Sequence, residues 1–497
     1  MERIGLWEEP LLMDEALHVG SLVDGTWQTD GERIAIHDPA HPARTVGTFV
    51  SASGELVERA VQAARSAQPA WRRATPIDRA RIVRRAAALV EDRGEAIARL
   101  MTREEGKTLA ESRGEVHRTV DTLHYHANQA WAATGTRYDS SNAAEHAWTQ
   151  RVPIGVVGAI TPWNFPLLIP AWKIAPALVH GNTVVWKPAS VTPLVAAEFA
   201  RALVDAGLPA GVLNLAHGPG SVGAQLVNHD DVDAITFTGS EPVGRGIQTA
   251  AVARGAKVQL ELGGHNPAIV LPDADLSQAV NALTAGVTSG SGQKCTATRR
   301  ILAHEAIHDE LVERLAKRFA ALTVGDGLVE GVELGPLVSG GARDDVVGEI
   351  DRAVREGAEV LTGGSALDGG DLDGGHYVAP TVLVTDDHAL RICREEVFGP
   401  VTTVLPVTDV DEAFARANDT RFGLAAAVFT ADERIVRRAA EELAVGMVNV
   451  NCSTTGSELH VPFGGMKASS APGPKEQGET AREFYTELKA VYVVPAG

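Results

Sequence analysis

The chain has 497 residues, 44% hydrophobic and 22% charged, which is too long for one ordinary core and predicts a globular protein of two or three domains. A formal net charge of −19 would repel nucleic acid and anionic membranes, so neither is expected as a partner. No segment approaches ~18 consecutive apolar residues, and no basic region followed by an apolar one opens the chain, so neither a membrane span nor a signal peptide is indicated and the cytoplasm is the expected location.

The first third of the chain predicts short strands followed by helices. Residues 18–53 have the pattern of short β segments broken by turns. The segment from Gly54 to Leu100 is rich in Ala and Arg, with apolar residues at helical spacing, and Arg103 to Ala133 predicts a second long helix. From Thr136 to Arg151 the residues are polar and strand-like, which indicates an excursion that could pair with another chain.

Residues 152–240 alternate between strands and helices. Strands are predicted at 155–160, 183–186, 212–215 and 234–237, with helices at 167–179, 194–206 and after 215. This alternation is typical of a doubly wound parallel sheet, in which ligands bind at the carboxyl ends of the strands. A second α/β series over residues 267–450 predicts a second domain.

A lone thiol lies on the Gly-rich stretch Gly290 to Thr298, where Cys295 follows the cation of Lys294. The thiolate is the attacking form, and its pKa falls beside positive charge or where backbone N–H groups converge, as at a small-residue turn before a helix. We interpret Cys295 as a nucleophile; the alternative is a small buried hydrophobic residue. Together with Cys393 and Cys452, it fits neither a disulfide framework nor a zinc site, so no metal is expected.

Two polar residues close predicted strands and offer further chemistry. Glu261 ends the run Lys257 to Leu260 before two glycines, so its carboxylate could face a cleft and act as a general base for water if burial keeps its pKa close to the working pH. A solvated strand end is the alternative. Asn164 follows another strand between prolines and aromatics, which would fix its amide as the rigid donor that an oxyanion site needs.

Two Gly-rich segments are candidates for binding phosphate. Gly218 to Gly223 matches G-x-G-x-x-G after a strand, yet no Asp or Glu closes a following strand about 20 residues later. Phe237 to Ser240 leads from a strand through a hydroxyl-rich turn into a helix, whose N–H groups could meet an anion; an ordinary capped helix start is the alternative. Lys187 closes a buried-looking strand, where a ribose hydroxyl or phosphate is a natural partner.

The sequence resembles the aldehyde dehydrogenase superfamily over nearly the whole chain. The resemblance rests on several motifs in the family's order, whose conjunction is very specific. They are Pro162-Trp163-Asn164-Phe165-Pro166, Trp186-Lys187-Pro188, Phe237-Thr238-Gly239-Ser240, Glu261-Leu262-Gly263-Gly264, Gly292-Gln293-Lys294-Cys295, Glu395-Glu396-Val397-Phe398-Gly399-Pro400 and Pro462-Phe463-Gly464-Gly465. The chain departs from the family at His265, where Lys is common; activity is expected to survive this change.

The resemblance implies catalytic roles for five residues. Cys295 would attack the aldehyde, while Asn164 and the Cys295 N–H would hold the oxyanion. Glu261 would activate the water that hydrolyses the thioester, and Lys173 and Glu476 match family positions linked to proton relay. The cofactor would be NADP or NAD. The residues expected to bind it are Thr161, Pro162, Trp163, Lys187, Ser190, Gly218, Phe237, Gly239, Ser240, Leu262, Glu396 and Phe398.

The implied fold is α/β, with a Rossmann-type coenzyme domain, a catalytic α/β domain and a small β oligomerisation arm. The expected ranges are 1–132 and 152–261 for the coenzyme domain, 262–456 for the catalytic domain, and 133–151 and 478–497 for the arm. A homodimer or homotetramer is expected.

The tail and the cysteine motif look most like bacterial and archaeal 2-oxoglutarate semialdehyde (2,5-dioxopentanoate) dehydrogenases, while an aromatic or aliphatic aldehyde stays open. Arg118 is expected to face inward from the helix Glu115 to Tyr125 and could pair with a substrate carboxylate; a surface Arg is the alternative. The other residues expected to line the aldehyde tunnel are Phe165, Trp172, Thr296 and Phe463.

A reading from a different class is a cysteine-dependent thioesterase or acyltransferase, which would not need Lys187 or the turn at Phe237 to Ser240. A coenzyme-A-acylating enzyme would be expected to lack the general base, so Glu261 favours water as acceptor.

Ser190 stands where NAD-preferring relatives often have Glu, whose charge repels a 2′-phosphate; Ser therefore predicts that NADP is accepted at least as well as NAD. Alternatively, Ser190 caps the helix that begins near Thr192.

Overall fold

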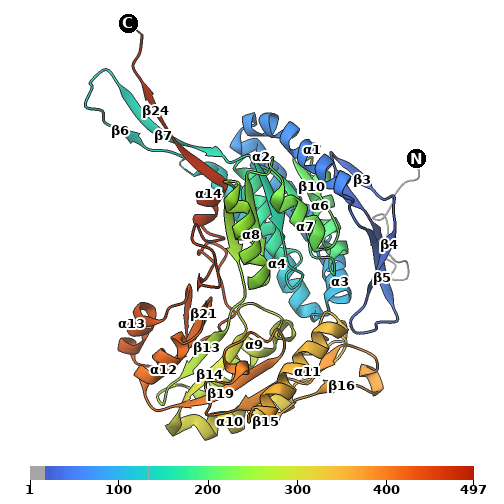
Figure 1. The fold of residues 1–497 in the computed structure, drawn as a ribbon, viewed down its shortest axis with the longest axis vertical. Helices are drawn as coiled ribbons and strands as arrows, with labels where there is room; N and C mark the ends of the chain where they lie inside the picture. The colour runs from blue at the N-terminus through green and yellow to red at the C-terminus, as the bar shows by residue number, and fades with distance from the viewer. Residues whose placement is uncertain (1–16, 133, 497) are drawn as a thin grey trace.

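Two seven-stranded sheets, each covered by helices, form the upper and lower halves of the molecule in Figure 1. The computed structural model describes residues 17–132 and 134–496. The fold is the expected α/β type, and most predicted elements are confirmed. The carboxyl ends of the parallel strands of the upper sheet therefore share one edge.

The upper sheet has the strand order β12-β11-β8-β9-β10-β2-β3. Its strands are β12 (Lys257–Glu261), β11 (Ala234–Thr238), β8 (Val156–Ile160), β9 (Thr183–Lys187), β10 (Leu213–Leu215), β2 (Ser21–Val23) and β3 (Thr26–Gln28). The first five run parallel, as the strand–helix alternation predicted, whereas β2 pairs antiparallel with β10. The N-terminal segment therefore extends the sheet at one edge.

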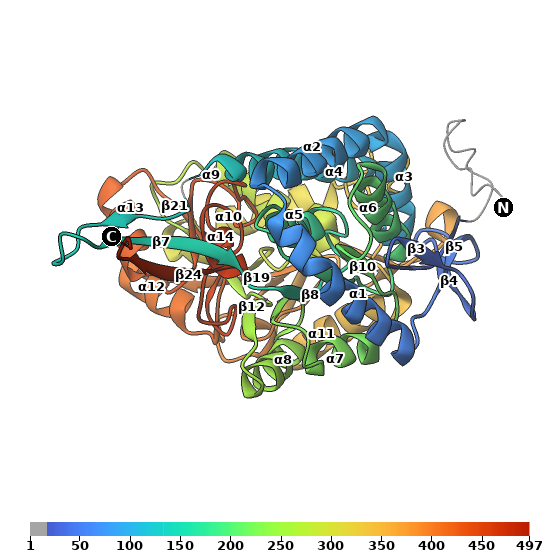
Figure 2. The same ribbon diagram turned by 90° about the horizontal axis from the view of Figure 1, so that it is seen from above.

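Helices cover both faces of the upper sheet (Figure 2). They are α1 (Gly54–Arg73), α2 (Pro76–Asp92), α3 (Gly94–Glu105), α4 (Leu109–Asn128), α5 (Leu168–Val179), α6 (Pro193–Asp205), α7 (Gly220–Asn228) and α8 (Glu241–Ala253). Alternate residues of β9 point to opposite faces: Val184 and Trp186 pack with α2, α4, α5 and α6, and Val185 packs with α1, α7 and α8. The central strands β8, β9, β10 and β11 are therefore buried on both faces.

The single long helix predicted from Arg103 to Ala133 is wrong. Helix α3 runs on to Glu105 and stops at Gly106, whose left-handed backbone (φ 101°) places its N–H on the carbonyl of Thr102. Helix α4 then starts at a capping box in which Thr108 and Glu111 exchange hydrogen bonds. A short buried turn thus separates two helices and becomes available to contact the site.

The lower sheet has the order β15-β18-β19-β14-β13-β21-β22. Its strands are β15 (Glu359–Thr362), β18 (Thr381–Val384), β19 (Val401–Val407), β14 (Thr298–His304), β13 (Asn266–Val270), β21 (Ala425–Phe429) and β22 (Met447–Val450). Its helices are α9 (Leu276–Thr288), α10 (Glu305–Ala320), α11 (Gly340–Arg355), α12 (Val410–Asn418) and α13 (Glu433–Glu442). Two apolar clusters fill its faces, one with α9 and α10, the other with α11, α12 and α13.

A three-stranded arm projects from the upper half (Figure 1). It contains β6 (Arg137–Tyr138), β7 (His146–Pro153) and β24 (Thr486–Val493), with β24 paired antiparallel along the whole of β7 after α14 (Thr480–Tyr485). The strand-like excursion predicted over residues 136–151 is confirmed, and it pairs with the C-terminal segment of its own chain.

The remaining short elements complete the fold. A third sheet joins β1 (Leu17–Val19), β5 (Thr45–Val50) and β4 (Arg33–His37), and two further pairs join β16 (Ala366–Leu367) with β17 (Tyr377–Val378) and β20 (Phe422–Gly423) with β23 (Met466–Lys467). Short 3-10 turns lie at Gln129–Trp131, Ser289–Gly292, Gly370–Leu372 and Arg391–Cys393.

Candidate active site

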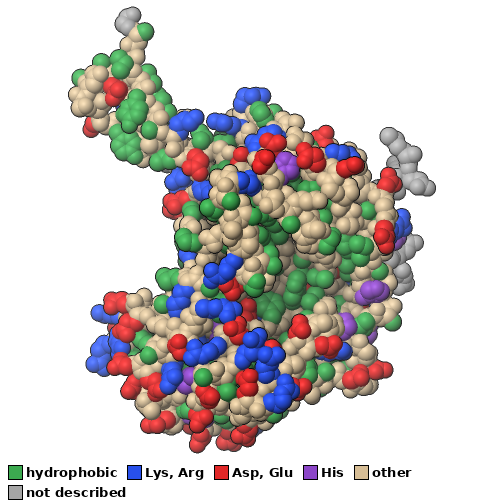
Figure 3. All heavy atoms as spheres, in the orientation of Figure 1, with side chains coloured by type: hydrophobic (Ala, Val, Ile, Leu, Met, Phe, Trp, Pro, Cys, Tyr) green, Lys and Arg blue, Asp and Glu red, His purple; other side chains and the backbone are tan. Residues whose placement is uncertain are grey.

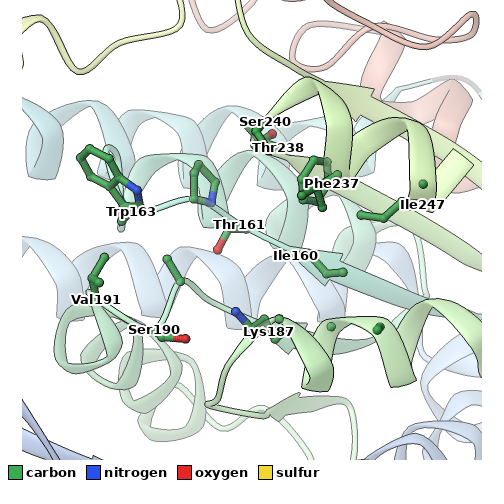
Figure 4. A pocket seen from close by; sticks show the side chains of 18 of the residues that line it. Ile160, Thr161, Trp163, Lys187, Ser190, Val191, Phe237, Thr238, Ser240 and Ile247 are labelled. Carbon is green, nitrogen blue, oxygen red and sulfur yellow. The ribbon is translucent and has the colours of Figure 1, made fainter. Parts of the chain in front are cut away.

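A cavity of ≈ 870 Å³ opens at the carboxyl ends of β8, β9 and β11 and is closed on the far side by the start of α11. Figure 3 shows the surface hollowed between the two halves, with hydrophobic side chains gathered there. The expected cofactor residues that line this cavity are Thr161, Pro162, Trp163, Lys187, Ser190, Phe237, Gly239 and Ser240. Figure 4 shows Lys187 and Ser190 on one wall and Thr238 and Ser240 on another. Its position is typical of a nucleotide site in a doubly wound sheet.

The polar groups of this cavity fit a ligand that carries phosphate and ribose. Burial lowers the pKa of Lys187 to about 8, and no carboxylate contributes to that shift. The buried Thr238 Oγ1 has no hydrogen-bond partner among the described residues. Helix α8 starts after Ser240 without a side-chain cap, so its N–H groups are not satisfied in the way that an ordinary capped start would satisfy them.

Ser190 lines the cavity but does not cap the helix that follows it. Its Oγ donates to the carbonyl of Gly218 at 2.6 Å. The residue preceding α6 is Thr192, which makes no side-chain capping bond. The alternative role weighed for Ser190 is therefore wrong, and its hydroxyl instead joins the loop after β9 to the one after β10.

The other expected cofactor residues lie outside the cavity wall. Gly218 accepts the Ser190 bond, and Leu262 N donates to the carbonyl of Ser469 at 2.8 Å. Glu396 accepts from the N–H of Gly264 at 3.2 Å, and the ring of Phe398 stands edge-on to that of Trp163 with centroids 5.6 Å apart. Phe398 thus extends the cavity wall from the lower half through Trp163.

Cys295 lies on a loop between the turn at Ser289–Gly292 and β14. Gly290 and Ser291 both adopt left-handed backbone conformations, and the Asn266 amide donates to the Cys295 carbonyl at 2.8 Å. Gly292 (φ 69°) passes so close to Gly399 that a Cβ there would lie 2.0 Å from its carbonyl oxygen. Strand β14 follows this loop, so no helix start directs its N–H groups at the thiol.

The expected lowering of the thiol pKa by Lys294 is also wrong. The Lys294 ammonium donates to Ser289 Oγ at 2.9 Å, and Lys294 is not among the groups that shift the thiol pKa. Burial raises the pKa of the Cys295 thiol to about 12, and the negative charges of Glu396 and Glu261 add to the effect. The resting thiol is therefore protonated, and its surroundings disfavour a second negative charge.

Asn164 and Glu261 are both buried beside this loop. The Asn164 amide Nδ2 donates to the carbonyl of Gln293 at 2.9 Å, which ties it to the segment carrying Cys295. Glu261 accepts from Ser470 Oγ at 2.8 Å, so it is not the solvated strand end weighed as its alternative. Burial and the nearby charge of Glu476 raise the pKa of Glu261 well above its usual range. A carboxyl with a raised pKa suits general-base work near neutral pH.

Lys173 and Glu476 form a buried ion pair. Lys173 also donates to Thr236 Oγ1 at 3.0 Å, and the backbones of Glu476 and Phe463 are hydrogen-bonded to each other. Glu476 also raises the pKa of Glu261, whereas Lys173 lowers it, so both residues act electrostatically on the proposed general base.

Cys295 packs against an apolar cluster. It contains Phe165, Leu168, Ile169, Trp172, Leu424, Met447 and Phe463 together with Cys295. The rings of Trp172 and Phe463 lie 5.1 Å apart, and Thr296 is buried next in the chain. The structure thus brings together Phe165, Trp172 and Phe463, three of the residues expected around the aldehyde.

Arg118 is partly buried on α4, where its guanidinium donates to the carbonyl of Ser457. It is therefore anchored to a loop of the C-terminal segment, and an inward orientation toward a substrate remains a proposal.

The Aldehyde dehydrogenase family profile matches residues 27–491 of this chain. The alpha-ketoglutaric semialdehyde dehydrogenase of Bacillus subtilis is 44% identical over 478 residues, covering 96% of this chain and 98% of that protein. The alpha-ketoglutarate semialdehyde dehydrogenase of Haloferax volcanii is 42% identical, with 95% and 98% coverage. The chain belongs to the aldehyde dehydrogenase family.

Solved aldehyde dehydrogenase structures share the fold. Betaine aldehyde dehydrogenase from Staphylococcus aureus in complex with NAD+ superposes with a TM-score of 0.93 at 35% identity, covering 95% of this chain and 94% of that one. An NADP dependent enzyme from E. coli has a TM-score of 0.92 at 36% identity, with 96% and 98% coverage. Both nicotinamide cofactors are thus named among proteins similar to this one.

Several residues that shape the site of this aldehyde dehydrogenase were missed by the sequence analysis. Asn228 and Asp345 line the cavity, Ser470 bonds Glu261, and Lys107 contacts the backbone of Asn164. Only Lys107 carried a usable signal, because lysine is scarce in this chain.

Neither a membrane-crossing helix nor a metal site emerges from the described part of this aldehyde dehydrogenase. Over residues 17–132 and 134–496, no helix is both long and apolar enough to span a bilayer. The same residues contain no cluster of His, Cys, Asp and Glu suited to holding a metal ion.

Proposed function

We propose that this aldehyde dehydrogenase oxidises 2,5-dioxopentanoate, or a related semialdehyde, to the free carboxylic acid with NADP or NAD. The observation that carries the proposal is the position of Cys295, which packs in the apolar cluster and interacts electrostatically with the buried carboxyl of Glu261. A nucleophile between an apolar substrate pocket and a general base suits acyl transfer to water.

The residues would act in the following order. The Cys295 thiol would give its proton to a solvent water, and the thiolate sulfur would attack the carbonyl carbon while the Asn164 amide and the Cys295 N–H stabilise the oxyanion. A bound nicotinamide supplies the hydride acceptor for the oxidation, which leaves a thioester on Cys295. Glu261 then takes a proton from water, whose oxygen attacks the thioester carbon; the C–S bond breaks, and the thiolate and the acid are released. Lys173 and Glu476 would pass the proton onward.

The cofactor would be held by the residues that line the cavity. Thr238 and the uncapped start of α8 after Ser240 suit a phosphate, while Lys187 suits a ribose hydroxyl or a phosphate. We propose that Glu396 and Phe398 hold the reacting end from the lower half, since Glu396 acts electrostatically on Cys295. Gly218 and Leu262 would support this site through their backbone bonds.

The substrate class is supported by the two semialdehyde dehydrogenase relatives, and Arg118 is our candidate for pairing with the substrate carboxylate. An aromatic or aliphatic aldehyde is the second candidate, favoured by the packed rings of Trp172 and Phe463. Initial rates with dioxopentanoate, succinate semialdehyde, hexanal and benzaldehyde test the choice. The highest kcat/KM is expected with dioxopentanoate, and a preference for benzaldehyde or hexanal would overturn it.

A cysteine-dependent thioesterase or acyltransferase is the alternative from another class. It requires neither an aldehyde nor a nicotinamide cofactor. Growth of NAD(P)H absorbance on adding an aldehyde is expected from our proposal and is incompatible with that alternative.

Cofactor preference is expected to depend on Ser190, which lines the cavity near Lys187. In Ser190→Glu, a carboxylate would face the 2′-phosphate of NADP; two like charges ~4 Å apart at an effective dielectric near 20 oppose each other by about 4 kcal/mol, an upper bound at a hydrated rim. We expect the wild type to accept NADP at least as well as NAD, and the variant to lower the NADP/NAD ratio of kcat/KM by about 10-fold or more.

Ser190→Ala is the matched control, because it removes the bond to Gly218 without adding charge. A ratio that stays the same in Ser190→Glu, or a wild type that already strongly prefers NAD, would contradict this assignment.

We also propose that the two halves are the coenzyme domain (1–132 and 152–261) and the catalytic domain (262–456), and that the arm (133–151 and 478–497) joins subunits into a homodimer or homotetramer in the cytoplasm. Exposed apolar side chains on the arm, including Tyr138, Leu488 and Tyr492, support a subunit contact there.

A further inference from the structure

The turn between α3 and α4 reaches under the proposed oxyanion residue. Lys107 is only 3% exposed, and its ammonium donates to Glu115 Oε2 at 2.6 Å and to the backbone carbonyl of Asn164 at 2.6 Å. The same ammonium lies 4.5 Å from the ring centroid of Phe165. A buried cation from a distant part of the chain therefore contacts the backbone of Asn164 directly.

Glu115 holds the other end of the same loop. Its Oε1 accepts from the N–H groups of Leu167 and Leu168, at 2.9 and 3.1 Å. Helix α5, which begins at Leu168, has no side-chain cap of its own, so Glu115 supplies the acceptor that the first turn lacks. The Lys107–Glu115 ion pair thus spans the loop from Asn164 to Leu167, with one partner fixing each end.

The nucleophile loop is tied to the same helix. Glu111, four residues before Glu115, accepts from the N–H of Gly290 at 2.5 Å. The Asn164 amide itself bonds the carbonyl of Gln293, so its direction depends on how both loops are placed. The start of α4 therefore sets the spacing between the amide donor and the thiol.

A role in stability alone does not explain the buried Lys107–Glu115 ion pair well. Taking an ammonium and carboxylates out of water costs more than the pair commonly returns, and apolar replacements often fold as well. Lys107 is in addition 3.9 Å from the buried carboxylate of Glu105. The specific gain is geometric, because oxyanion donors act only when held at the place where charge develops.

We propose that Lys107 and Glu115 are positioning residues, which act through Asn164 to hold its amide where the oxyanion forms. This inference rests on the proposed function of Asn164. It predicts that the kinetic effect of Lys107 depends on Asn164 being present.

The test is a double-mutant cycle in the full-length enzyme, with Lys107→Met, Asn164→Ala and the double variant. Loss of an oxyanion donor costs about 10²–10³-fold in kcat, so Asn164→Ala should fall in that range. Lys107→Met should lower kcat by about 10²-fold through misplacement of the amide, with the KM for the cofactor nearly unchanged. In the Asn164→Ala background, Lys107→Met should lower kcat by less than about 2-fold further.

Ser112→Ala is the control for stability. Ser112 is buried in the same helix and bonds Thr102 at 2.9 Å without contacting Asn164, so it should lower Tm while leaving kcat close to wild type. If Lys107→Met does not fold, Glu115→Gln enters the same cycle, since it keeps an acceptor for Leu167 and Leu168 but removes the carboxylate partner of Lys107.

The two proposals fail in different ways. Full activity in Asn164→Ala would overturn the oxyanion role itself. Loss of activity in Asn164→Ala, with an equally large further loss on adding Lys107→Met, would leave that role standing and overturn the positioning inference.

Discussion

Cys295→Ala is expected to abolish aldehyde oxidation, with kcat reduced on the order of 10⁶-fold, the scale seen when a covalent nucleophile is removed. Without the sulfur no thioester forms, whereas the cavity residues that would hold the cofactor are untouched. Cofactor binding, followed by quenching of protein fluorescence, should therefore stay close to wild type. Steady turnover in this variant would exclude Cys295 as the nucleophile.

Cys452→Ala provides the matched control. Cys452 is exposed, whereas Cys393 is buried and Cys295 is partly accessible. Cys452→Ala should keep full activity, and iodoacetamide should still inactivate it. Cys295→Ala should have no activity for this reagent to block. Inactivation that depends on Cys452 would place the reactive thiol elsewhere.

Glu261→Gln is expected to separate the two halves of the reaction. The glutamine keeps the size of the side chain and a bond with Ser470, but it cannot take a proton from water. Rapid mixing should show a burst of reduced cofactor close to one per site, followed by turnover slowed by about 10²-fold or more, the scale of general-base catalysis. Loss of the burst would assign Glu261 to a step before the thioester.

The pH dependence of turnover gives a second view of Glu261. Burial raises its pKa well above the usual carboxyl range, Glu476 adds to the rise, and Ser470, Lys475 and Lys173 oppose it. A base must be ionised to act, so thioester hydrolysis should increase with pH until Glu261 has lost its proton, at a higher pH than an ordinary carboxyl would allow. This limb should be absent from the single-turnover hydrolysis rate of Glu261→Gln.

Most strands and helices could be predicted from local pattern. Runs such as Thr183 to Trp186 are apolar on both sides and alternate with helical segments, which a buried parallel sheet requires. The error at Arg103 to Ala133 has a local cause. No apolar residue occurs between Met101 and Leu109, so periodicity alone does not place the break at Gly106 and Lys107.

The sequence by itself determined which residues meet at the site, because Thr161, Lys187, Ser240 and Glu261 end or follow neighbouring parallel strands, whose carboxyl ends share one edge. The family motifs carried this expectation to Cys295 across the two halves.

Only the tertiary structure decided the electrostatics and the support of these groups. Lys294 is next to Cys295 in the chain, yet its ammonium bonds Ser289, and the thiol is governed by burial and by carboxylates that folding brings near. Ser470 reaches Glu261 across 209 residues, and Lys107 reaches Asn164 across 57. Burial and long-range contacts exist only once the chain has packed. They set the pKa values of Cys295 and Glu261 and the orientation of the Asn164 amide.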